Sequence, residues 1–218
     1  SENTGAGIHV FRFCQITSCT ISRNSGIGIY ASPYSWIEST IADSTIAGNL
    51  GGGVSVDGAS VIRCRITGNR TGVIPGDRDS SLEDCEIAYN ESSGDGGGVY
   101  CNGTTGSITN CRIVGNTAGG RGGGVFGTWG ARIDRCTISG NTANDYGGGV
   151  WGNDFVISNS IISDNAVVGA GGCGGGISTD MGVTISNCTL TGNIGEDAGG
   201  ALHVRMDGEI TTIANCVL

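Results

Sequence analysis

Thiols, carboxylates and aromatic rings are the side chains of this chain that could carry chemistry. The sequence has 10 cysteines but only two histidines, His9 and His203, and no Cys-x-x-Cys pair, so no metal site is expected. The acidic residues are scattered over predicted turns. Asp145 and Asp197 lie in loops that could approach one another, yet nothing in the sequence pairs them as acid and base. We therefore expect no catalytic residues and no cofactor.

Most of the cysteines share one position of a repeating pattern. They are Cys19, Cys64, Cys85, Cys111, Cys136, Cys188 and Cys216, and Ser44 and Ser160 occupy the same position in two further copies. A position that accepts Cys or Ser is typical of small-residue packing, so these thiols are predicted to be reduced and buried. Disulfides between neighbouring copies are the alternative, although side chains that point the same way fit disulfide dihedral angles poorly. Outside this position, Cys173 is expected to be the exposed thiol.

An asparagine ends each copy of the pattern, which reads Ile-x-x-Cys-x-Ile-x-x-Asn. The series is Asn3, Asn24, Asn49, Asn69, Asn90, Asn116, Asn141, Asn165 and Asn193. The spacing of 20 to 28 residues predicts a solenoid of about nine coils, in which equivalent residues stack along the axis. Each asparagine amide can then donate to the next one and accept from the one before. Asparagine is also expected to supply the left-handed backbone conformation of the turn.

Within each copy, apolar and polar residues alternate over short stretches, as in Cys111 to Val114, and this alternation indicates strands. Second strands follow glycine-rich turns, as at Val99-Tyr100-Cys101 and Val125-Phe126-Gly127. No segment has the i, i+3, i+4 spacing of an amphipathic helix. The fold class is therefore predicted to be all-β, a right-handed parallel β-helix that spans residues 1–218 as a single domain.

The Ile-x-x-Asn motif followed by Gly-Gly-Gly-Val or Gly-Gly-Ala-Leu resembles the right-handed β-helix repeats of the pectate-lyase-like superfamily. Within that superfamily, the chain is most similar to the repeats of polymorphic outer-membrane proteins and similar bacterial surface proteins. The resemblance implies a secreted or surface-displayed protein, often an adhesive one. Lyases of the superfamily use acidic calcium clusters with a basic Arg or Lys, and its hydrolases use grouped aspartates. This chain has no lysine, and its acidic residues are not grouped.

Composition excludes several classes of partner. The chain carries a formal net charge of −9 and no basic stripe, so a nucleic-acid partner is not expected. No apolar run approaches the roughly 20 residues that a membrane-spanning helix needs, so no membrane span is predicted.

The spacing from each asparagine to the next strand divides the chain into two halves. It is five residues in the first four copies, the last of them Asn69 to Ile74, and nine or twelve residues in the last five copies. The later copies therefore carry longer glycine-rich loops along one edge. The rest of the pattern runs through both halves unchanged, so no domain boundary is predicted.

The outward position of the second strand contains several aromatic residues. It reads His9, Tyr30, Ser55, Pro75, Tyr100, Phe126, Trp151, Ser178 and His203. Tyr100, Phe126 and Trp151 are consecutive and predict an aromatic stripe, to which Tyr30 adds a fourth candidate binding residue. If exposed, the stripe could contact a glycan or a surface receptor. The alternative is that the long glycine-rich loops fold over it.

A second outward column alternates in charge at its centre. Arg65, Glu86 and Arg112 are predicted to lie on adjacent rungs and to form ion pairs. They interrupt an array of threonine and serine residues that would otherwise suggest ice binding.

Both ends of the chain fall within a copy of the pattern. After Cys216-Val217-Leu218 the pattern requires two residues and an asparagine, and Ser1-Glu2-Asn3 supplies them. The residues predicted to take part in head-to-tail pairing are Ser1, Glu2, Asn3, Ile8, Ile213, Cys216 and Leu218. An uncapped strand edge templates further pairing, and a head-to-tail contact that does not close makes a fibre. The alternative is a segment excised from a longer solenoid.

These observations favour a structural protein, extracellular or on the cell surface, that is not an enzyme. Copies of the chain are expected to join end to end into a filament or appendage. One alternative is an adhesin segment that binds a glycan or a receptor, and another is a β-helix related to polysaccharide lyases or hydrolases.

Overall fold

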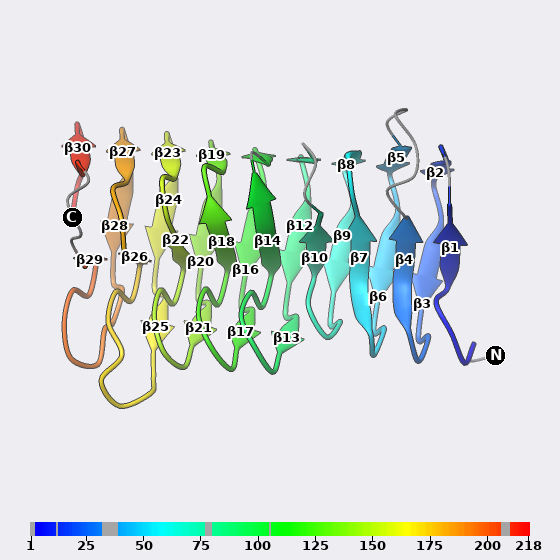
Figure 1. Ribbon diagram of the computed structural model, residues 1–218, viewed down its shortest axis with the longest axis horizontal. Coiled ribbons are helices and arrows are strands. Elements are labelled where there is room, and N and C mark those ends of the chain that lie inside the picture. The colour runs from blue at the N-terminus through cyan, green and yellow to red at the C-terminus, as the bar shows by residue number, and fades with distance from the viewer. Residues whose placement is uncertain (1–2, 12, 32–38, 77–79, 105, 206–209) are drawn as a thin grey trace.

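The computed structural model describes residues 3–11, 13–31, 39–76, 80–104, 106–205 and 210–218. Short strands stack along the long axis of the molecule, with the N-terminus at one end and the C-terminus at the other (Figure 1). All elements of the described residues are strands, and every strand pair among them is parallel. The prediction of an all-β parallel solenoid is therefore confirmed.

Two sheets run the whole length of the solenoid. Sheet A contains β1 (Ile8–Val10), β4 (Ile27–Ala31), β7 (Gly52–Val56), β10 (Val73–Pro75), β14 (Val99–Thr104), β18 (Val125–Trp129), β22 (Val150–Gly152), β26 (Ile177–Thr179) and β29 (Leu202–Val204). Sheet B contains β2 (Gln15–Thr17), β5 (Ser39–Ala42), β8 (Ala59–Ile62), β11 (Ser81–Glu83), β15 (Ser107–Thr109), β19 (Arg132–Asp134), β23 (Val156–Ser158), β27 (Thr184–Ser186) and β30 (Thr212–Ala214).

The third and fourth sheets are shorter. Sheet C contains β3 (Thr20–Ser22), β6 (Thr45–Ala47), β9 (Arg65–Thr67), β12 (Glu86–Ala88), β16 (Arg112–Val114), β20 (Thr137–Ser139), β24 (Ile161–Ser163) and β28 (Thr189–Thr191). Sheet D contains β13 (Glu91–Ser92), β17 (Thr117–Ala118), β21 (Thr142–Ala143) and β25 (Ala166–Val167). Eight coils are therefore complete, and in the ninth a bridge between Thr189 and Val217 continues sheet C. Sheet D begins only at the fifth coil.

Stacked aliphatic side chains fill the interior. In sheet C, Ile113 pairs in register with Ile87 on one side and Ile138 on the other, and all three side chains are fully buried. β-Branched residues suit this position because their stiff side chains pack well against a pleated surface. The neighbouring columns of sheets A and B are built in the same way and form one continuous core.

The asparagine column is a continuous hydrogen-bonded ladder. Asn116 Nδ2 donates to Asn141 Oδ1 over 3.0 Å and to the carbonyl oxygen of Ile87 over 3.0 Å. Asn116 Oδ1 in turn accepts from the backbone N–H of Asn90 over 3.0 Å and from its Nδ2 over 2.9 Å. Nδ2-to-Oδ1 hydrogen bonds link the whole series from Asn3 to Asn193. Both the nitrogen and the oxygen of the buried side-chain amide therefore have hydrogen-bond partners.

Each coil turns at single residues with left-handed backbone. One of them directly precedes the Cys or Ser position, as Arg63 does with φ 48°, and another directly precedes the asparagine, as Gly115 does with φ 63°. The expectation that the ladder asparagines themselves adopt this conformation is wrong, since none of them has a positive φ. The preceding residue makes the turn, and the asparagine side chain is then free to point inward and stack.

The fourth coil differs from the predicted spacing by one residue. Val73 pairs with Val54 and Val99, whereas Ile74 pairs with Ser55 and faces outward. The inward strand residue after Asn69 is therefore Val73 and not Ile74, one residue earlier than predicted. By the same shift Pro75, which is predicted to face outward, is buried. The sequence could not decide this point because both Val73 and Ile74 are apolar, and a shift of one residue exchanges the two faces of a strand.

Candidate functional site

The aromatic stripe exists, but most of it lies inside the folded protein. The rings of Tyr100 and Phe126 stack with centroids 5.0 Å apart, and those of Phe126 and Trp151 stack with centroids 4.8 Å apart. Phe126 is only 2% exposed and Trp151 only 4%. Of the two alternatives left open by the sequence, burial under the loops therefore holds for these two residues. Tyr100 and Tyr30 are half-buried.

The long glycine-rich loops cover the stripe. At Gly122, a Cβ atom would lie 2.8 Å from the Phe126 Cβ, and at Gly147 it would lie 2.8 Å from the Trp151 Cβ. Both glycines have a positive φ, of 67° and 65°, so the backbone can come this close to Phe126 and Trp151 only where no side chain intervenes.

The side chain of Arg121 lies over the aromatic rings and helps to hold the loops in place. Its guanidinium carbon lies 4.2 Å from the centroid of the Trp151 ring and 5.1 Å from that of Phe126. Arg121 Nη2 also pairs with Asp95 Oδ2 over 2.9 Å, and the Arg121 backbone N–H donates to Asp95 Oδ1 over 2.7 Å. This cation–π and ion-pair arrangement holds two adjacent loops against sheet A. The position of Arg121 in the sequence does not predict this role, because Asp95 and Trp151 come from other coils.

The column of cysteines is a packing column. All ten cysteines are free thiols, and Cys64, Cys85, Cys111 and Cys136 are each buried. The thiol of Cys111 donates to the carbonyl oxygen of Thr109, two residues earlier, over 3.3 Å, and the Ser160 hydroxyl likewise donates to that of Ser158 over 2.6 Å. The hydroxyl and the thiol thus use the same backbone partners, which explains why Ser replaces Cys in the column. Cys188 is buried as well, so the prediction of burial is confirmed for these five thiols, whereas in the end coils Cys19 is exposed and Cys216 is half-buried.

The cysteines outside the column differ from expectation. Cys173 is buried rather than exposed, because its loop forms bridges with Tyr146 on one side and Ala198 on the other. The exposed thiol is instead Cys19, which belongs to the column and lies in the first coil. Burial raises the pKa of the Cys101 thiol to about 12, so this side chain stays neutral at physiological pH.

The charged column on sheet C forms the predicted ion pairs. Glu86 Oε2 lies 3.3 Å from Arg65 Nε, and Glu86 Oε1 lies 2.8 Å from Arg112 Nη1. One carboxylate therefore links three adjacent rungs on the outer surface of the sheet.

Several acidic side chains have structural partners. Asp134 accepts hydrogen bonds from Asn159 Nδ2 and Ser158 Oγ, which lower its pKa from the ordinary value. Asp145 and Asp197 lie in loops two rungs apart, about 10 Å along the axis, with the loop that contains Cys173 between them. The structure therefore does not bring this pair together. Among the described side chains, no group of three or more His, Cys, Asp or Glu residues could hold a metal ion.

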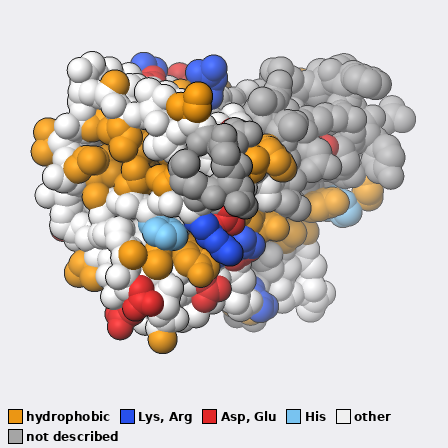
Figure 2. All heavy atoms as spheres, turned by 60° about the vertical axis from the view of Figure 1, so that its left-hand side comes forward, with side chains coloured by type: hydrophobic (Ala, Val, Ile, Leu, Met, Phe, Trp, Pro, Cys, Tyr) orange, Lys and Arg blue, Asp and Glu red, His pale blue; other side chains and the backbone are white. Residues whose placement is uncertain are grey.

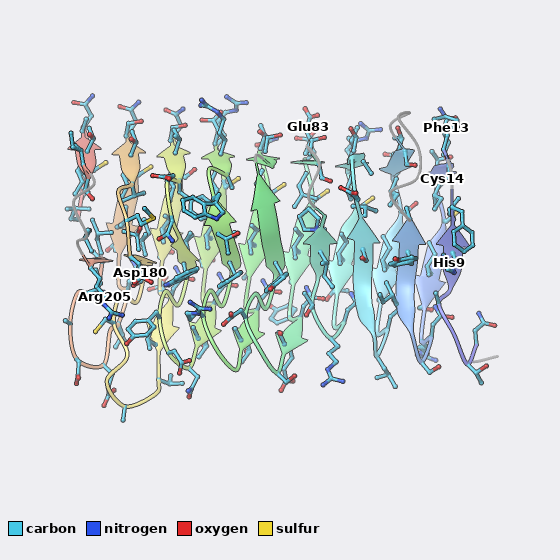
Figure 3. All side chains as sticks on the ribbon, viewed as in Figure 1. His9, Phe13, Cys14, Glu83, Asp180 and Arg205 are labelled. Atoms are coloured by element: carbon cyan, nitrogen blue, oxygen red, sulfur yellow. The ribbon has the colours of Figure 1, made fainter. Side chains whose placement is uncertain are left out.

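The ends of the solenoid present apolar edges. Ile213 of β30 is 43% exposed and Leu218 is 63% exposed, while Cys216 and, at the other end, Ile8 are half-buried. Figure 2 turns the C-terminal end forward and shows hydrophobic side chains gathered on that side. In Figure 3, His9 and Phe13 lie at the N-terminal coil. Asn3 is exposed there, and the predicted contact residues Ser1 and Glu2 lie outside the described residues.

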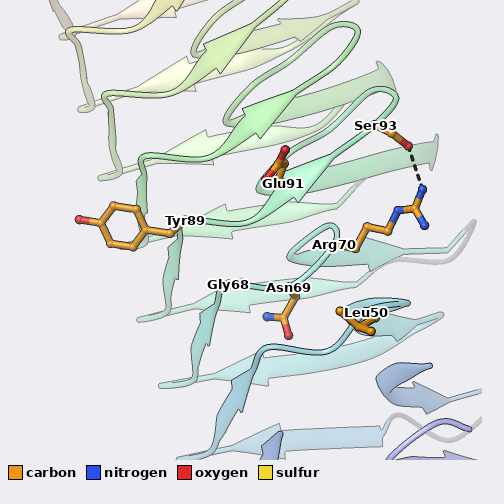
Figure 4. Close-up of a pocket in the computed structure, with 7 residues that line it drawn as sticks. All are labelled: Leu50, Gly68, Asn69, Arg70, Tyr89, Glu91 and Ser93. Atoms are coloured by element: carbon orange, nitrogen blue, oxygen red, sulfur yellow. Dashed lines mark hydrogen bonds between the residues drawn. The ribbon is translucent and has the colours of Figure 1, made fainter. Parts of the chain in front are cut away.

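A concavity of about 750 Å³ lies where sheet D begins (Figure 4). Its lining residues are Leu50, Gly68, Asn69, Arg70, Tyr89, Glu91 and Ser93. This site was not among those predicted from the sequence. A signal was present, because Tyr89 interrupts a turn position that reads Gly48, Gly68, Gly115 and Gly140 in the neighbouring coils.

No helix in the part of the chain that the structure describes is long and apolar enough to cross a membrane. Neither the curated proteins nor the solved structures yielded a match to the chain. A family model described as a right handed beta helix region matches residues 53–218. The closer resemblance to the pectate-lyase-like superfamily and to outer-membrane-protein repeats stays a prediction. The match covers most of the chain and agrees with its parallel coils, so the chain belongs to the right-handed β-helix family.

Proposed function

We propose that this β-helix is a structural, extracellular protein whose copies stack end to end into a filament. The observation that carries the proposal is the apolar edge that the last coil of these 218 residues presents. The edge strand β30 exposes Ile213, and beyond it Val217 and Leu218 are each 63% exposed. An open strand edge with exposed apolar side chains is a template for another strand.

The register of the coils supports a stacked arrangement. Ile213 continues the column of Ile185, and Thr212 and Ala214 continue the columns of Thr184 and Ser186. A second copy placed with its first coil on this edge would set its Ile16 beside Ile213 without a shift of register. Such a head-to-tail contact does not close on itself and therefore propagates.

The proposal assigns no reaction to the chain. It is supported by the use of acidic side chains as structural partners, as with Glu86 between two arginines and Asp95 against Arg121. The adhesin alternative requires an exposed aromatic stripe, and Phe126 and Trp151 of that stripe are buried.

The experiment follows the mass of the 218-residue chain by light scattering as its concentration rises, with electron microscopy of the product. We expect the mass to grow with concentration and filaments to form. Ile213→Lys should prevent growth, because it places a charge in the apolar contact. The matched control is Ile161→Lys, since Ile161 is 48% exposed but lies on β24, which is paired on both sides.

Circular dichroism shows whether both variants keep their β structure. A wild-type chain that stays monomeric at high concentration contradicts the filament. So does an Ile213→Lys variant that assembles as the wild type does.

A further inference from the structure

We propose that the concavity at the start of sheet D binds a small zwitterion. Its cationic ammonium group would lie against Tyr89 and Glu91, and its anionic group against Arg70. This site is independent of the filament proposed above, because it lies in the middle of the solenoid rather than at its ends.

The concavity arises from a step between two coils. In the fourth coil the chain passes from Asn69 to Val73 through a short turn, whereas the fifth coil adds β13 and a long glycine-rich loop. β13 is the first strand of sheet D, so the fifth coil overhangs the fourth. Figure 4 shows Arg70 extending beneath this overhang toward Ser93, with Leu50 one coil further down.

Tyr89 occupies a backbone position that suits glycine. Its φ is 54°, and the neighbouring coils place Gly68 and Gly115 at the same turn. A bulky residue with this φ costs free energy, although Arg23 and Asp164 also adopt it at the equivalent turns of the first and seventh coils. The Tyr89 ring lies against Gly115, where an added Cβ would come within 2.8 Å of Cε1, yet the residue is 63% exposed. It therefore adds little to the core and lines one edge of the concavity, with its ring directed away from Arg70 and Ser93 (Figure 4).

Arg70 and Glu91 hold opposite charges on adjacent rungs without pairing. Elsewhere in the chain, adjacent rungs of opposite charge do pair, as Glu86 does with Arg112 over 2.8 Å. The side chain of Arg70 instead donates from Nη2 to Ser93 Oγ over 3.2 Å, and no described carboxylate lies within salt-bridge distance of it. Both side chains are exposed and line the same concavity.

A ligand with charges of both signs fits this arrangement better than a single ion. The net charge of −9 disfavours a free anion, and Arg70 repels a free cation. A substituted ammonium can contact the Tyr89 ring and the Glu91 carboxylate together, while a phosphate or carboxylate on the same molecule receives hydrogen bonds from Arg70. The exposed Leu50 side chain offers an apolar contact for the carbon atoms between the two charges.

Isothermal titration calorimetry tests the site with defined probes. Phosphocholine and glycine betaine carry both charges, choline carries only the cation, and inorganic phosphate only the anion. We expect saturable binding of at least one of the two zwitterions, about ten-fold tighter than binding of choline or of phosphate. Comparison of the zwitterions shows which acid group is preferred, and phosphatidylcholine vesicles show whether a lipid headgroup can also enter.

Variants connect the binding to the named residues. Tyr89→Gly restores the residue that neighbouring coils use at this turn, so the fold should be kept while zwitterion affinity falls about ten-fold. Arg70→Gln should lower the affinity for the zwitterion and leave the affinity for choline unchanged or higher. Arg132→Gln, an exposed arginine on sheet B, is the matched control and should bind as the wild type does.

Three outcomes would overturn the proposal. They are the absence of zwitterion binding at millimolar concentration, equal affinity for choline or phosphate alone, and unchanged binding in the Tyr89→Gly or Arg70→Gln variant. Thermal unfolding of each variant shows that a loss of binding does not come from a loss of fold.

Discussion

In each turn, the ladder asparagine and the residue before it have different structural roles. The residue before the asparagine adopts the left-handed conformation, as Gly140 does with φ 61°, and the asparagine satisfies the buried polar groups. Because every amide serves both neighbours, the loss of one side chain leaves partners on two other coils without hydrogen bonds.

Asn116→Leu is expected to lower the free energy of unfolding by on the order of 3 kcal/mol, because the buried partners on Asn90, Asn141 and Ile87 lose their hydrogen bonds. Urea denaturation measures the change. Asn144→Leu is the control, since Asn144 is exposed and its side chain, among the described residues, donates a hydrogen bond to the adjacent Asp145 alone; it should cost less than about 0.5 kcal/mol. Equal stability of the two variants would contradict the ladder's role.

At the scale of elements, the long loops act as a second layer outside sheet A. They bury the aromatic stripe through close backbone approach and through Arg121, whose guanidinium lies over Trp151 and pairs with Asp95. The loops contribute few apolar side chains of their own. Besides backbone hydrogen bonds between adjacent loops, such as that from the Gly96 N–H to the Arg121 carbonyl oxygen over 2.9 Å, their attachment therefore depends on the aromatic stack beneath them and on the Arg121 side chain.

Arg121→Ala is expected to loosen the loops and to expose Trp151. With Trp36 and Trp129 replaced by Phe, quenching of the remaining Trp151 fluorescence by acrylamide should increase. The free energy of unfolding should fall by about 2 kcal/mol, from the lost cation–π and ion-pair contacts. Arg132→Ala in the same background is the control. Unchanged quenching and stability in Arg121→Ala would show that the glycine backbone alone holds the cover.

At the scale of the whole molecule, each coil contacts only the coils beside it. The strand order of the two longest sheets follows the order of the chain, so an inner coil is held on both faces and an end coil on one. Stability in such a solenoid is a sum of coil and interface contributions. The ends should therefore open more readily than the centre.

Hydrogen exchange of the dilute, monomeric chain is expected to be slowest in the central strands, such as β16 and β20, and fastest in β1 and β30. In concentrated samples that have assembled, amides of β30 should become protected while those of β16 stay unchanged. Mass spectrometry of peptides resolves these regions. Equal exchange rates along the monomer would contradict the description of its stability as a sum of coil and interface contributions. Unchanged exchange of β30 in large assemblies would show that the copies do not contact one another through β30.

The sequence by itself determined the stacked coils and their interior. Its period of Ile, Cys and Asn specifies the parallel sheets, the buried columns and the amide ladder, because each of these depends on one residue type recurring at one position. It also specified the ion pairs of Glu86, whose partners occupy equivalent positions of adjacent coils.

Only the tertiary structure decided which outward residues are exposed. Phe126 and Trp151 are buried because loops from their own and neighbouring coils fold back over them, and Cys173 is buried because its loop is bridged on both sides. The concavity at Tyr89 likewise exists because a short turn and a long loop meet on adjacent rungs. Residues 20 to 28 positions apart in the chain come within about 5 Å in space, and contacts beyond the repeating core depend on loop paths that the repeat does not encode.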